Sequence, residues 1–345
     1  MNNFWNNKNV LVTGHTGFKG SWISLYLKFL GANVYGLSSS ELDGVYKLAN
    51  VSSIISNECF IDLSIHNQEK KISSFMEEIN PDIVFHFAAQ SLVLESYRNP
   101  RKTLDANIMG TFNLIESVNN SSVNPKIVIA TTDKVYKHPD NLNNEQSELG
   151  GKDFYSISKV SKELLVEAIL NHPEFKNLTI SRVRSGNVIG GGERREDRLF
   201  TDLITSYIKN ENYILRNPFA IRPWQYILDS LTGYLLVGKK TLESNESLIY
   251  NLNSEINNKY NVEQIANLFL KHSNGENKII IDENSIYSEV SKLVINSTKA
   301  GNELGWIAKA ELDMIVKNII DWETHHFNNS GPEYSFSEIE NFLNI

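Results

Sequence analysis

A tyrosine and a lysine four residues apart give this chain its clearest potential for proton-transfer chemistry. Tyr155 and Lys159 begin a segment whose apolar residues Val160, Leu164 and Ile169 predict a helix. The four-residue spacing places both side chains on one helix face. A phenol has a pKa of about 10, too high for a base at neutral pH, but a nearby ammonium stabilises the phenolate and lowers that pKa. Such a pair alone is usually a solvated surface pair, so a second motif is needed.

A glycine-rich turn directly after the first apolar run supplies that motif. Gly14, Gly17 and Gly20 follow residues 9–13 with the spacing G-x-x-G-x-x-G and open a predicted helix over 20–30. Glycines let the backbone approach a pyrophosphate closely, and the N–H groups at the helix N-terminus attract its charge. The context predicts a dinucleotide site, and the positive ring of an oxidised nicotinamide would lower the pKa of the phenol further.

The second predicted strand, over 33–37, lacks the acidic residue that usually holds an adenosine ribose. Ser38, Ser39 and Ser40 follow it, and no arginine stands there to favour a 2′-phosphate. This strand therefore leaves NAD and NADP undecided. Asp62, at the end of the third predicted strand, could face the adenine, although an aspartate in that place is more often a turn residue.

Six short apolar runs predict the strands of a parallel sheet. They lack polar alternation, which suits strands covered by helices on both faces. We expect a Rossmann-type doubly wound α/β fold with a smaller, interwoven C-terminal α/β domain. The dinucleotide-binding domain is expected over 1–186, with about 220–255 returning to it, and the substrate domain mainly over 187–345. Further helices are expected over 261–271 and 312–325. The predicted strands lie at 9–13, 33–37, 59–62, 82–86, 126–130 and 178–183.

Composition excludes several classes of protein. The chain has 345 residues, 41% hydrophobic and 21% charged, so disorder is excluded and about two domains are expected. The net charge of -8, without a basic run, speaks against nucleic acid. The single cysteine, Cys59, excludes an internal disulfide and a cysteine-based zinc site. His15 and His86 are isolated, so no metal is expected. With no leader and no long apolar run, we expect a cytoplasmic protein without membrane contact.

The glycine loop, Asn107 and the Tyr155/Lys159 pair together resemble the extended short-chain dehydrogenases/reductases. Longer sequence motifs resemble those of the nucleotide-sugar dehydratases, and among these most specifically those of the CDP-glucose 4,6-dehydratases. The likeness runs nearly end to end. The phrases that carry it lie at 12–22, 86–90, 131–134, 149–153, 186–192, 216–225, 304–306 and 335–339.

The resemblance implies a lyase reaction by internal hydride transfer with NAD. Tyr155 takes the proton of the sugar 4-hydroxyl while hydride leaves C4 for the nicotinamide. The 4-ketone acidifies the C5 hydrogen, water is eliminated across C5 and C6, and the hydride returns to C6. CDP-glucose would give CDP-4-keto-6-deoxyglucose, a step of deoxysugar synthesis for surface polysaccharide such as lipopolysaccharide O-antigen.

Three residues directly after the predicted strand at 126–130 have roles that the resemblance implies. Thr132 hydrogen-bonds the 4-hydroxyl, and Asp133 is the acid for the departing 6-hydroxyl if burial raises its pKa. Without the neighbouring motifs, Thr-Asp would be a turn cap. Related dehydratases place a glutamate next as the C5 base, where this chain has Lys134. An ammonium cannot take a proton unless its pKa falls by several units, so enolate stabilisation is its other open role. The C5 base is left open.

The resemblance also implies binding residues and an assembly. Helices near 103–116 and 155–170 would form a homodimer or a dimer of dimers, and Asn107 is expected to hold the region of the fourth strand. Asn187, Arg198, Leu199 and Arg222 are expected to bind the nucleotide diphosphate of the sugar. The expected cofactor contacts are Gly14, His15, Thr16, Gly17, Phe18, Lys19, Asp62, Leu63, Phe87, Ala88, Ala89, Tyr155 and Lys159.

Departures from the family phrases leave the nucleotide base and the hexose open. Residues 193–195 read Glu-Arg-Arg where Asp-Trp is usual, Phe154 replaces a proline, and Tyr226 replaces a histidine. Residues 251–253 replace an Asn-Phe-Gly phrase. The alternatives are a 4,6-dehydratase of another nucleotide-hexose, or a 4-epimerase, which needs no acid beside Thr132. A non-catalytic sugar-nucleotide-binding protein is the third, and the retained catalytic set argues against it.

Overall fold

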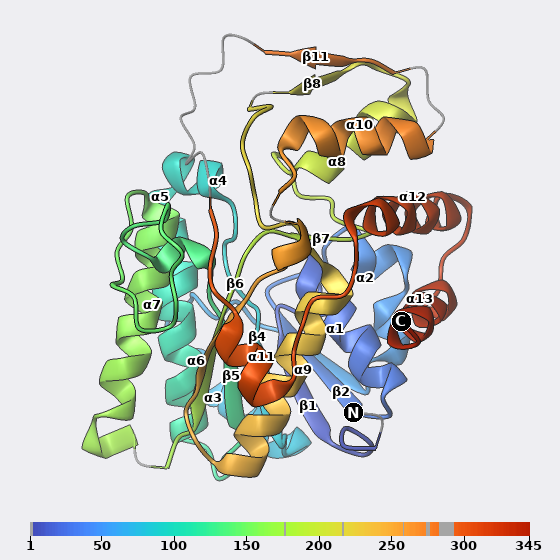
Figure 1. Cartoon of the computed structure of the whole chain (residues 1–345). Helices are drawn as coiled ribbons and strands as arrows, with labels where there is room; N and C mark the ends of the chain where they lie inside the picture. Colours follow the sequence, from blue (N-terminus) through green and yellow to red (C-terminus); the bar gives the residue numbers. More distant parts are fainter. Residues whose placement is uncertain (1–2, 176, 216, 258, 274–276, 283–292) are drawn as a thin grey trace.

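The computed structural model describes residues 3–345 except 176, 216, 258, 274–276 and 283–292. Seven parallel strands form its main sheet in the order β10-β6-β5-β4-β1-β2-β3 (Figure 1). The expected doubly wound α/β fold is confirmed. The strands are β1 (Asn9–Thr13), β2 (Asn33–Ser38), β3 (Asn57–Phe60), β4 (Ile83–His86), β5 (Lys126–Ala130), β6 (Ile180–Ser185) and β10 (Ile249–Leu252).

Strand positions follow the apolar runs closely. The third strand begins and ends two residues before the predicted 59–62, so Asp62 lies beyond it. The sixth strand is shifted by two residues, to Ile180–Ser185. β10 was not predicted as a strand; it comes from the late part of the chain and pairs with β6 through Ile249↔Arg182.

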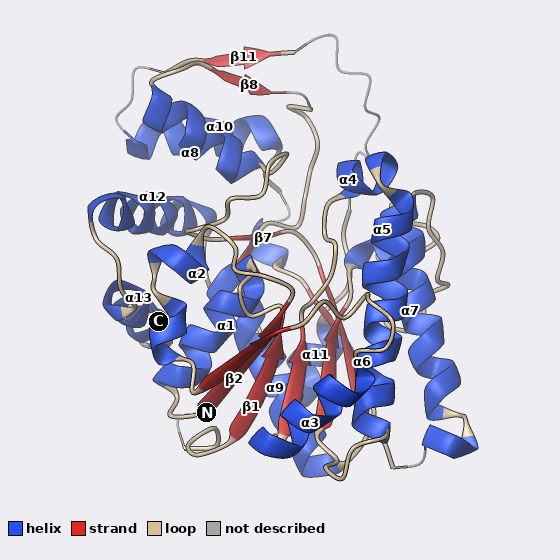
Figure 2. Ribbon diagram, turned by 180° about the vertical axis from the view of Figure 1, so that it is seen from behind, coloured by secondary structure: helices blue, strands red, loops and turns tan. Residues whose placement is uncertain are grey.

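Helices cover both faces of this sheet, as Figures 1 and 2 show from opposite sides. α1 and α9 pack in one hydrophobic cluster, and α3, α6 and α7 in the other. Successive side chains of β1 point to opposite faces, so Val10 and Val12 belong to the first cluster and Leu11 to the second. The helices are α1 (Phe18–Phe29), α3 (Glu69–Ile79), α6 (Gly110–Asn119), α7 (Phe154–Leu170) and α9 (Ile227–Ser244).

Shorter elements join these layers. α4 (Val93–Arg98), α5 (Pro100–Leu104) and the π-turn η2 (Asp105–Met109) lead into α6. The others are α2 (Val45–Leu48), α11 (Thr298–Leu304) and the 3-10 turns η1 (Val51–Ile54), η3 (Asp133–Val135), η4 (Pro173–Phe175) and η5 (Glu255–Asn257).

The later part of the chain adds two small sheets and a group of helices, drawn in the upper part of Figure 1. The predicted helices at 261–271 and 312–325 correspond to α10 and α12. Among the described residues, no helix is long and apolar enough to cross a membrane. The elements are β7 (Val188–Ile189) paired with β9 (Gln225–Tyr226), β8 (Tyr213–Leu215) paired with β11 (Ile279–Ile281), α8 (Leu199–Lys209), α10 (Val262–Ser273), α12 (Leu312–Asn328) and α13 (Glu333–Leu343).

Candidate active site

The first turn of α7 presents the tyrosine and lysine on a fixed helix end. Asp153 is the N-cap: its carboxylate accepts from the Ser156 N–H at 2.9 Å and from the Ser156 hydroxyl at 2.8 Å. Tyr155 and Lys159 are both buried, and Lys159 Nζ lies 5.7 Å from the centroid of the Tyr155 ring. The capped turn therefore holds the two side chains together inside the protein.

Burial governs the protonation of this pair. It raises the pKa of Tyr155 to about 12, against the opposing effects of Arg198 and a hydrogen bond with Thr132. Burial, reinforced by the nearby Lys19 charge, lowers the pKa of Lys159 to about 7. In the protein alone, burial outweighs the neighbouring charges at Tyr155. The expected lowering of the phenol pKa includes the positive ring of a bound nicotinamide and stays a prediction.

Thr132, Asp133 and Lys134 follow β5 at its carboxyl end. The Thr132 hydroxyl accepts from the Lys134 N–H at 3.4 Å and donates to Asp133 Oδ1 at 3.0 Å. The other carboxyl oxygen, Asp133 Oδ2, is buried and has no hydrogen-bond partner among the described residues. Lys134 Nζ lies 3.7 Å from Asp133 Oδ1. Thr132 is thus both the cap of the turn and a neighbour of Tyr155.

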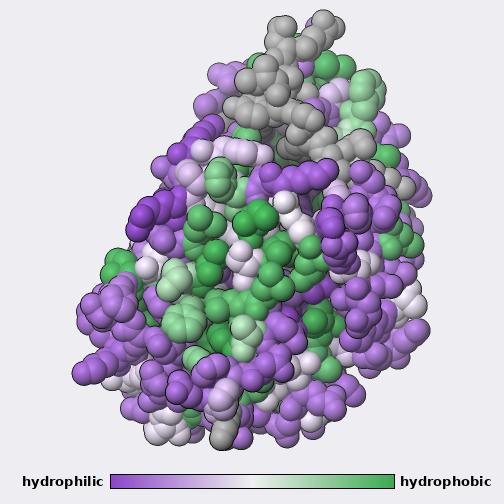
Figure 3. Space-filling view, turned by 90° about the vertical axis from the view of Figure 1, so that its left-hand side faces the viewer, coloured by the Kyte–Doolittle hydropathy of each residue, from purple (hydrophilic) through white to green (hydrophobic). Residues whose placement is uncertain are grey.

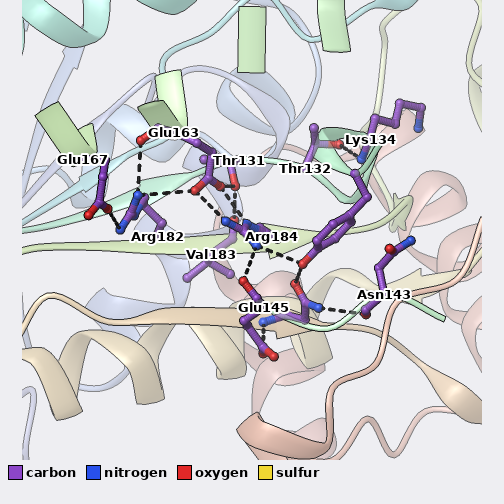
Figure 4. Close-up of polar contacts among 12 residues, drawn as sticks. Thr131, Thr132, Lys134, Asn143, Glu145, Glu163, Glu167, Arg182, Val183 and Arg184 are labelled. Carbon is purple, nitrogen blue, oxygen red and sulfur yellow. Dashed lines mark hydrogen bonds and ion pairs between the residues drawn. The ribbon is translucent and has the colours of Figure 1, made fainter. Parts of the chain in front are cut away.

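A buried network fixes the end of β5 against α7 (Figure 4). The Thr131 hydroxyl donates to Glu163 Oε1 at 2.7 Å. Arg184, on β6, donates to both oxygens of the same carboxylate at 3.0 Å each. Glu163 lies one turn after Lys159, so the network links the strand that carries Thr132 to the helix that carries Lys159.

The network continues to β10 through Tyr136. Arg184 donates to the Tyr136 hydroxyl at 3.1 Å, and that hydroxyl donates to Asn251 Oδ1 at 2.6 Å. Asn251 Nδ2 in turn donates to the Asn143 carbonyl at 3.2 Å. Asn251, the first residue of the 251–253 motif, therefore joins β10 to the loop after β5.

The glycine loop fits the pyrophosphate of a dinucleotide. Gly14 has a φ of 72°, and a Cβ there would lie 2.7 Å from the Ala88 nitrogen. A Cβ on Gly20 would lie 2.0 Å from the Gly14 carbonyl oxygen. Gly17 precedes α1, whose first turn has no side-chain cap and no acidic residue. The first N–H groups of α1 lack intrahelical partners, which is the arrangement that binds phosphate.

Two other residues of this loop point into the protein. His15 Nε2 lies 2.8 Å from Glu58 Oε2, and its Nδ1 lies 3.0 Å from the Ser38 hydroxyl. Burial lowers the pKa of His15. Thr16 donates to the Ser40 carbonyl at 2.9 Å. The sequence left His15 isolated; the fold gives it partners on β2 and β3, and it braces the loop.

Of the remaining expected cofactor contacts, some lie beside the glycine loop and others are exposed or buried elsewhere. Asp62 is exposed, and its Oδ1 accepts from the Ser64 N–H at 2.9 Å, so its carboxylate serves a turn. Leu63 is buried and its carbonyl accepts from Asn113 Nδ2 at 2.8 Å. Phe87, Ala88 and Ala89, after β4, are partly buried, and Ala88 adjoins Gly14. Gly17 and Phe18 line a pocket with Leu42, Asp43 and residues 192–195.

Asn107 holds the loop after β4, as expected. Its side chain donates to the Gln90 carbonyl at 3.0 Å and accepts from the Gln90 N–H at 2.8 Å. It also donates to the Ser158 hydroxyl on α7 at 2.8 Å. Asn107 thus joins this loop to the helix that carries Tyr155.

The expected substrate-binding residues lie in the part of the chain between β6 and β9. Arg198 donates to the Ser91 carbonyl at 3.0 Å and influences the pKa of Tyr155. Leu199 is the first residue of α8. The Asn187 carbonyl accepts from the Gln225 N–H at 3.0 Å, and the buried Arg222 donates to the carbonyl of its neighbour, Ile221. Arg198 is therefore the member of this set that the structure brings to Tyr155.

The fold adds a residue that sequence reasoning missed. Tyr234, on α9, is fully buried, and its hydroxyl has no hydrogen-bond partner among the described residues. Its ring lies 4.9 Å from that of Phe87, and its centroid lies 5.7 Å from Lys19 Nζ. In the sequence Tyr234 looks like any core tyrosine of an apolar helix, so no local signal marks it.

Comparisons with known proteins show the family to which this chain belongs. A family model described as GDP-mannose 4,6 dehydratase matches residues 11–319. The CDP-glucose 4,6-dehydratase of Salmonella typhimurium is 33% identical over 332 residues, 93% of this chain and 91% of that relative. A UDP-glucose 4-epimerase of Pisum sativum is 25% identical over 340 residues, 91% of this chain and 95% of the relative.

Solved structures agree on the fold. The UDP-glucose-4-epimerase from Stenotrophomonas maltophila, with bound NAD and formylated UDP-arabinopyranose, superposes with a TM-score of 0.79. The match covers 92% of this chain and 98% of that one at 20% sequence identity. At this identity the likeness supports the fold alone.

Proposed function

The chain belongs to the GDP-mannose 4,6-dehydratase family, and from that membership we propose that it is an NAD-dependent nucleotide-sugar 4,6-dehydratase acting on CDP-glucose. The observation that carries the proposal is the meeting of Tyr155 and Lys159 with Thr132 and Asp133 in one buried site. We choose CDP-glucose as the substrate because the Salmonella relative is a CDP-glucose 4,6-dehydratase.

The glycine loop is the proposed place of NAD. When bound, NAD supplies a hydride acceptor for C4 of the sugar and a hydride donor for C6. The N–H groups at the start of α1 would hold its pyrophosphate, since Gly14 and Gly17 leave the backbone open and no carboxylate opposes the charge. Solved structures of this fold, such as the Stenotrophomonas maltophila epimerase, contain bound NAD.

Tyr155 and Asp133 divide the proton transfers of the reaction. Tyr155 takes the proton of the 4-hydroxyl, which Thr132 orients by hydrogen bonding. Burial raises the pKa of Tyr155 to about 12, so this pKa must fall before the phenol can act as a base. A positive nicotinamide ring beside the hydroxyl would lower it. Asp133 gives a proton to the departing 6-hydroxyl; its buried Oδ2 has no partner among the described residues and is the atom suited to this.

Arginines are the proposed partners of the substrate diphosphate. A chain of net charge -8 must gather cations locally to bind a dianion. Arg198 and Arg222, with Asn187 and Leu199, are the proposed contacts, since guanidinium groups match phosphate oxygens well. The Glu-Arg-Arg motif at 193–195 lines the pocket beside Phe18. This departure from the family motif is where the preference for one nucleotide base of the substrate would differ.

A 4-epimerase is the competing reaction, because several relatives are 4-epimerases. It shares Tyr155 and Lys159 but needs no acid beside Thr132. The buried Asp133 favours dehydration. A non-catalytic sugar-nucleotide-binding protein would have no use for this complete set of four residues.

We further propose a homodimer through the face of α7 and its neighbours. Figure 3 shows hydrophobic side chains gathered on this side of the molecule. A second copy would cover them with the same face, as in a two-fold dimer. The exposed apolar side chains on these helices are Tyr97, Met109, Phe154, Ile157 and Leu164. The cytoplasmic location and the role in deoxysugar synthesis stay predictions.

The test of the function is the mass of the product. Purified protein is incubated with NAD and CDP-glucose, and the expected product has lost one water. An isomer of unchanged mass would replace the dehydratase by the epimerase. Thermal shifts with CDP-, dTDP-, GDP- and UDP-glucose then rank the nucleotides, because a ligand that binds the native state raises its stability.

A further inference from the structure

Residues 190–195, here called the strap, follow β7 and run between helices in close contact. A Cβ on Gly191 would lie 2.5 Å from Cγ of Trp322, on α12. A Cβ on Gly192, whose φ is 84°, would meet both Trp322 and Val45, on α2. Side chains at these two positions would displace the strap, so the glycines allow its close packing against α2 and α12.

Polar contacts hold the strap from two helices. The Gly191 carbonyl accepts from Trp22 Nε1, on α1, at 2.9 Å. The Gly192 N–H donates to Glu323 Oε1, on α12, at 2.8 Å. Arg194 donates to both oxygens of the same carboxylate, with an Nη1–Oε1 distance of 2.8 Å and an Nη2–Oε2 distance of 2.5 Å. The Glu323 side chain is only 9% exposed, so water competes little with this two-point ion pair.

The strap faces the proposed cofactor site across a pocket. Gly17 and Phe18, at the start of α1, line one part of the pocket, and residues 192–195 line another. Leu42 and Asp43, a few residues after the end of β2, complete the lining. In doubly wound folds the pyrophosphate of a dinucleotide lies at the N-terminus of the first helix, and its adenosine ribose lies near the end of the second strand. The strap therefore lies over the place of the phosphate and ribose groups.

A 4,6-dehydratase depends on keeping its reduced cofactor during turnover. The hydride taken from C4 is returned to C6 of the same sugar, so release of the reduced cofactor between the two transfers leaves the sugar unfinished. The end of β2 has Ser38, Ser39 and Ser40 in place of the acidic residue that usually holds the ribose. Another part of the chain must then hold this end of the cofactor.

We propose that Glu323 is a positioning residue that, through its ion pair with Arg194, holds the strap over the cofactor and slows its release. This inference rests on the proposed 4,6-dehydratase function and deepens it. Glu323 is not among the residues that line the pocket, so it acts through the strap. Arg194 serves the strap as well, because both of its terminal nitrogens donate to Glu323.

The strap also leads toward the proposed substrate site. The Glu193 carbonyl accepts from the Thr201 hydroxyl, on α8, at 3.1 Å, which joins the strap to that helix. Arg198 lies between these two residues in the chain, donates to the Ser91 carbonyl at 3.0 Å and influences the pKa of Tyr155. One segment thus connects the cofactor pocket with the proposed diphosphate site, so the hold on the cofactor is measured without sugar present.

The rate of NADH release tests the proposal directly. Protein loaded with NADH is mixed with excess NAD in a stopped-flow instrument, and the loss of bound-NADH fluorescence gives the dissociation rate. Glu323→Gln keeps an oxygen for the Gly192 N–H but loses the charge that pairs with Arg194. We expect release about tenfold faster in Glu323→Gln and in Arg194→Met, the scale of one charge-assisted hydrogen bond. Asp321→Asn, which changes an exposed carboxyl of the same helix, is the control and should release NADH at the wild-type rate.

The double variant Glu323→Gln/Arg194→Met separates one ion pair from two independent effects. Because the two groups act as a pair, the double variant should release NADH within about threefold of either single variant. Release about a hundredfold faster than in the wild type would mean additive effects and would overturn the role of the pair.

Thermal unfolding measures the merely structural contribution of Glu323. A lower melting temperature of Glu323→Gln with wild-type NADH release would overturn the proposal, since the carboxylate would then only stabilise α12. If Glu323→Gln does not fold, Arg194→Met decides by the same two measurements, because its side chain is more exposed than that of Glu323.

Turnover of CDP-glucose connects the strap to the reaction. Without added NAD, Glu323→Gln should lose activity over successive turnovers and regain it when excess NAD is added, while the wild type keeps its activity. Equal decay in the variant and the wild type would overturn the role in turnover. If the wild type dehydrates none of the four nucleotide-glucoses, the proposed function fails, whereas the NADH release rates still decide whether Glu323 holds the cofactor.

Discussion

Arg184 and Glu163 form a two-point ion pair in the interior, with Nε–Oε1 and Nη2–Oε2 distances of 3.0 Å each. Both side chains are almost completely buried. The pair joins β6 to α7 one turn beyond Lys159, and the Thr131 hydroxyl shares the same carboxylate. The helix that carries Tyr155 and Lys159 and the segment after β5 that carries Thr132 are therefore held by one buried charge cluster.

Breaking this cluster should cost much of the stability of the protein. Glu163→Gln leaves the buried Arg184 without a counter-charge, and loss of one partner of a buried pair costs about 3–5 kcal/mol. The measurement is urea unfolding of the variant and the wild type. Glu167→Gln is the control, because its carboxylate is 59% exposed and its pairing with Arg182 is worth little. Equal losses in both variants would contradict the prediction.

Tyr155→Phe should stop turnover and keep cofactor binding. The substitution removes the hydroxyl proposed to take the 4-hydroxyl proton and retains the buried ring beside Lys159. We expect a loss of at least about 10²–10⁴-fold, the range for a missing acid or base. The assay follows product mass, and NADH fluorescence checks binding. Full activity in the variant would remove Tyr155 as the base.

Asp133→Asn should slow elimination more than oxidation. The amide keeps the size of the side chain but cannot give a proton to the 6-hydroxyl. Reduced cofactor should then accumulate during turnover, seen as near-ultraviolet absorbance in a stopped-flow experiment. Equal slowing of oxidation and elimination would argue against the acid role of Asp133.

The C-terminal helix should make stability depend on pH. Burial raises the pKa of Glu338 to about 8, and its carboxyl accepts a hydrogen bond from Tyr226. Because the pKa is higher in the folded than in the unfolded protein, the contribution is complete below about pH 4.5 and is lost as pH rises through 8. Urea unfolding between pH 6 and 9 should show that the free energy of unfolding falls less with rising pH for Glu338→Gln than for the wild type. Glu340→Gln, on the exposed side of α13, should decline like the wild type.

A charge on the α7 face should dissociate the proposed dimer. Leu164 is 56% exposed there, and Leu164→Glu would place a carboxylate opposite its copy in a two-fold contact. Light scattering with size exclusion should give a monomer mass for this variant and twice that mass for the wild type. Ile307→Glu is the control, since Ile307 is 73% exposed and lies in the loop between α11 and α12. A wild-type monomer would contradict the dimer.

The sequence by itself determined six of the seven strands of the main sheet and the main motif positions. Buried strands read as short runs without polar alternation, so β1, β2, β4 and β5 lie within one residue of their predicted places. The turn at Gly14 and the spacing of Tyr155 and Lys159 are local features, set by backbone sterics and helix geometry. Such features can be read wherever neighbouring residues alone decide the conformation.

Only the tertiary structure decided which distant groups share one environment. It brought Lys19 to the ring of Tyr234 and placed the charge of Arg198 where it acts on the Tyr155 hydroxyl, although these residues lie far apart in the chain. It also buried Tyr155, which raises the pKa of the phenol to about 12 in the protein alone. Burial and charge are sums over neighbours from many segments, so protonation depends on the whole fold while strand and helix positions do not.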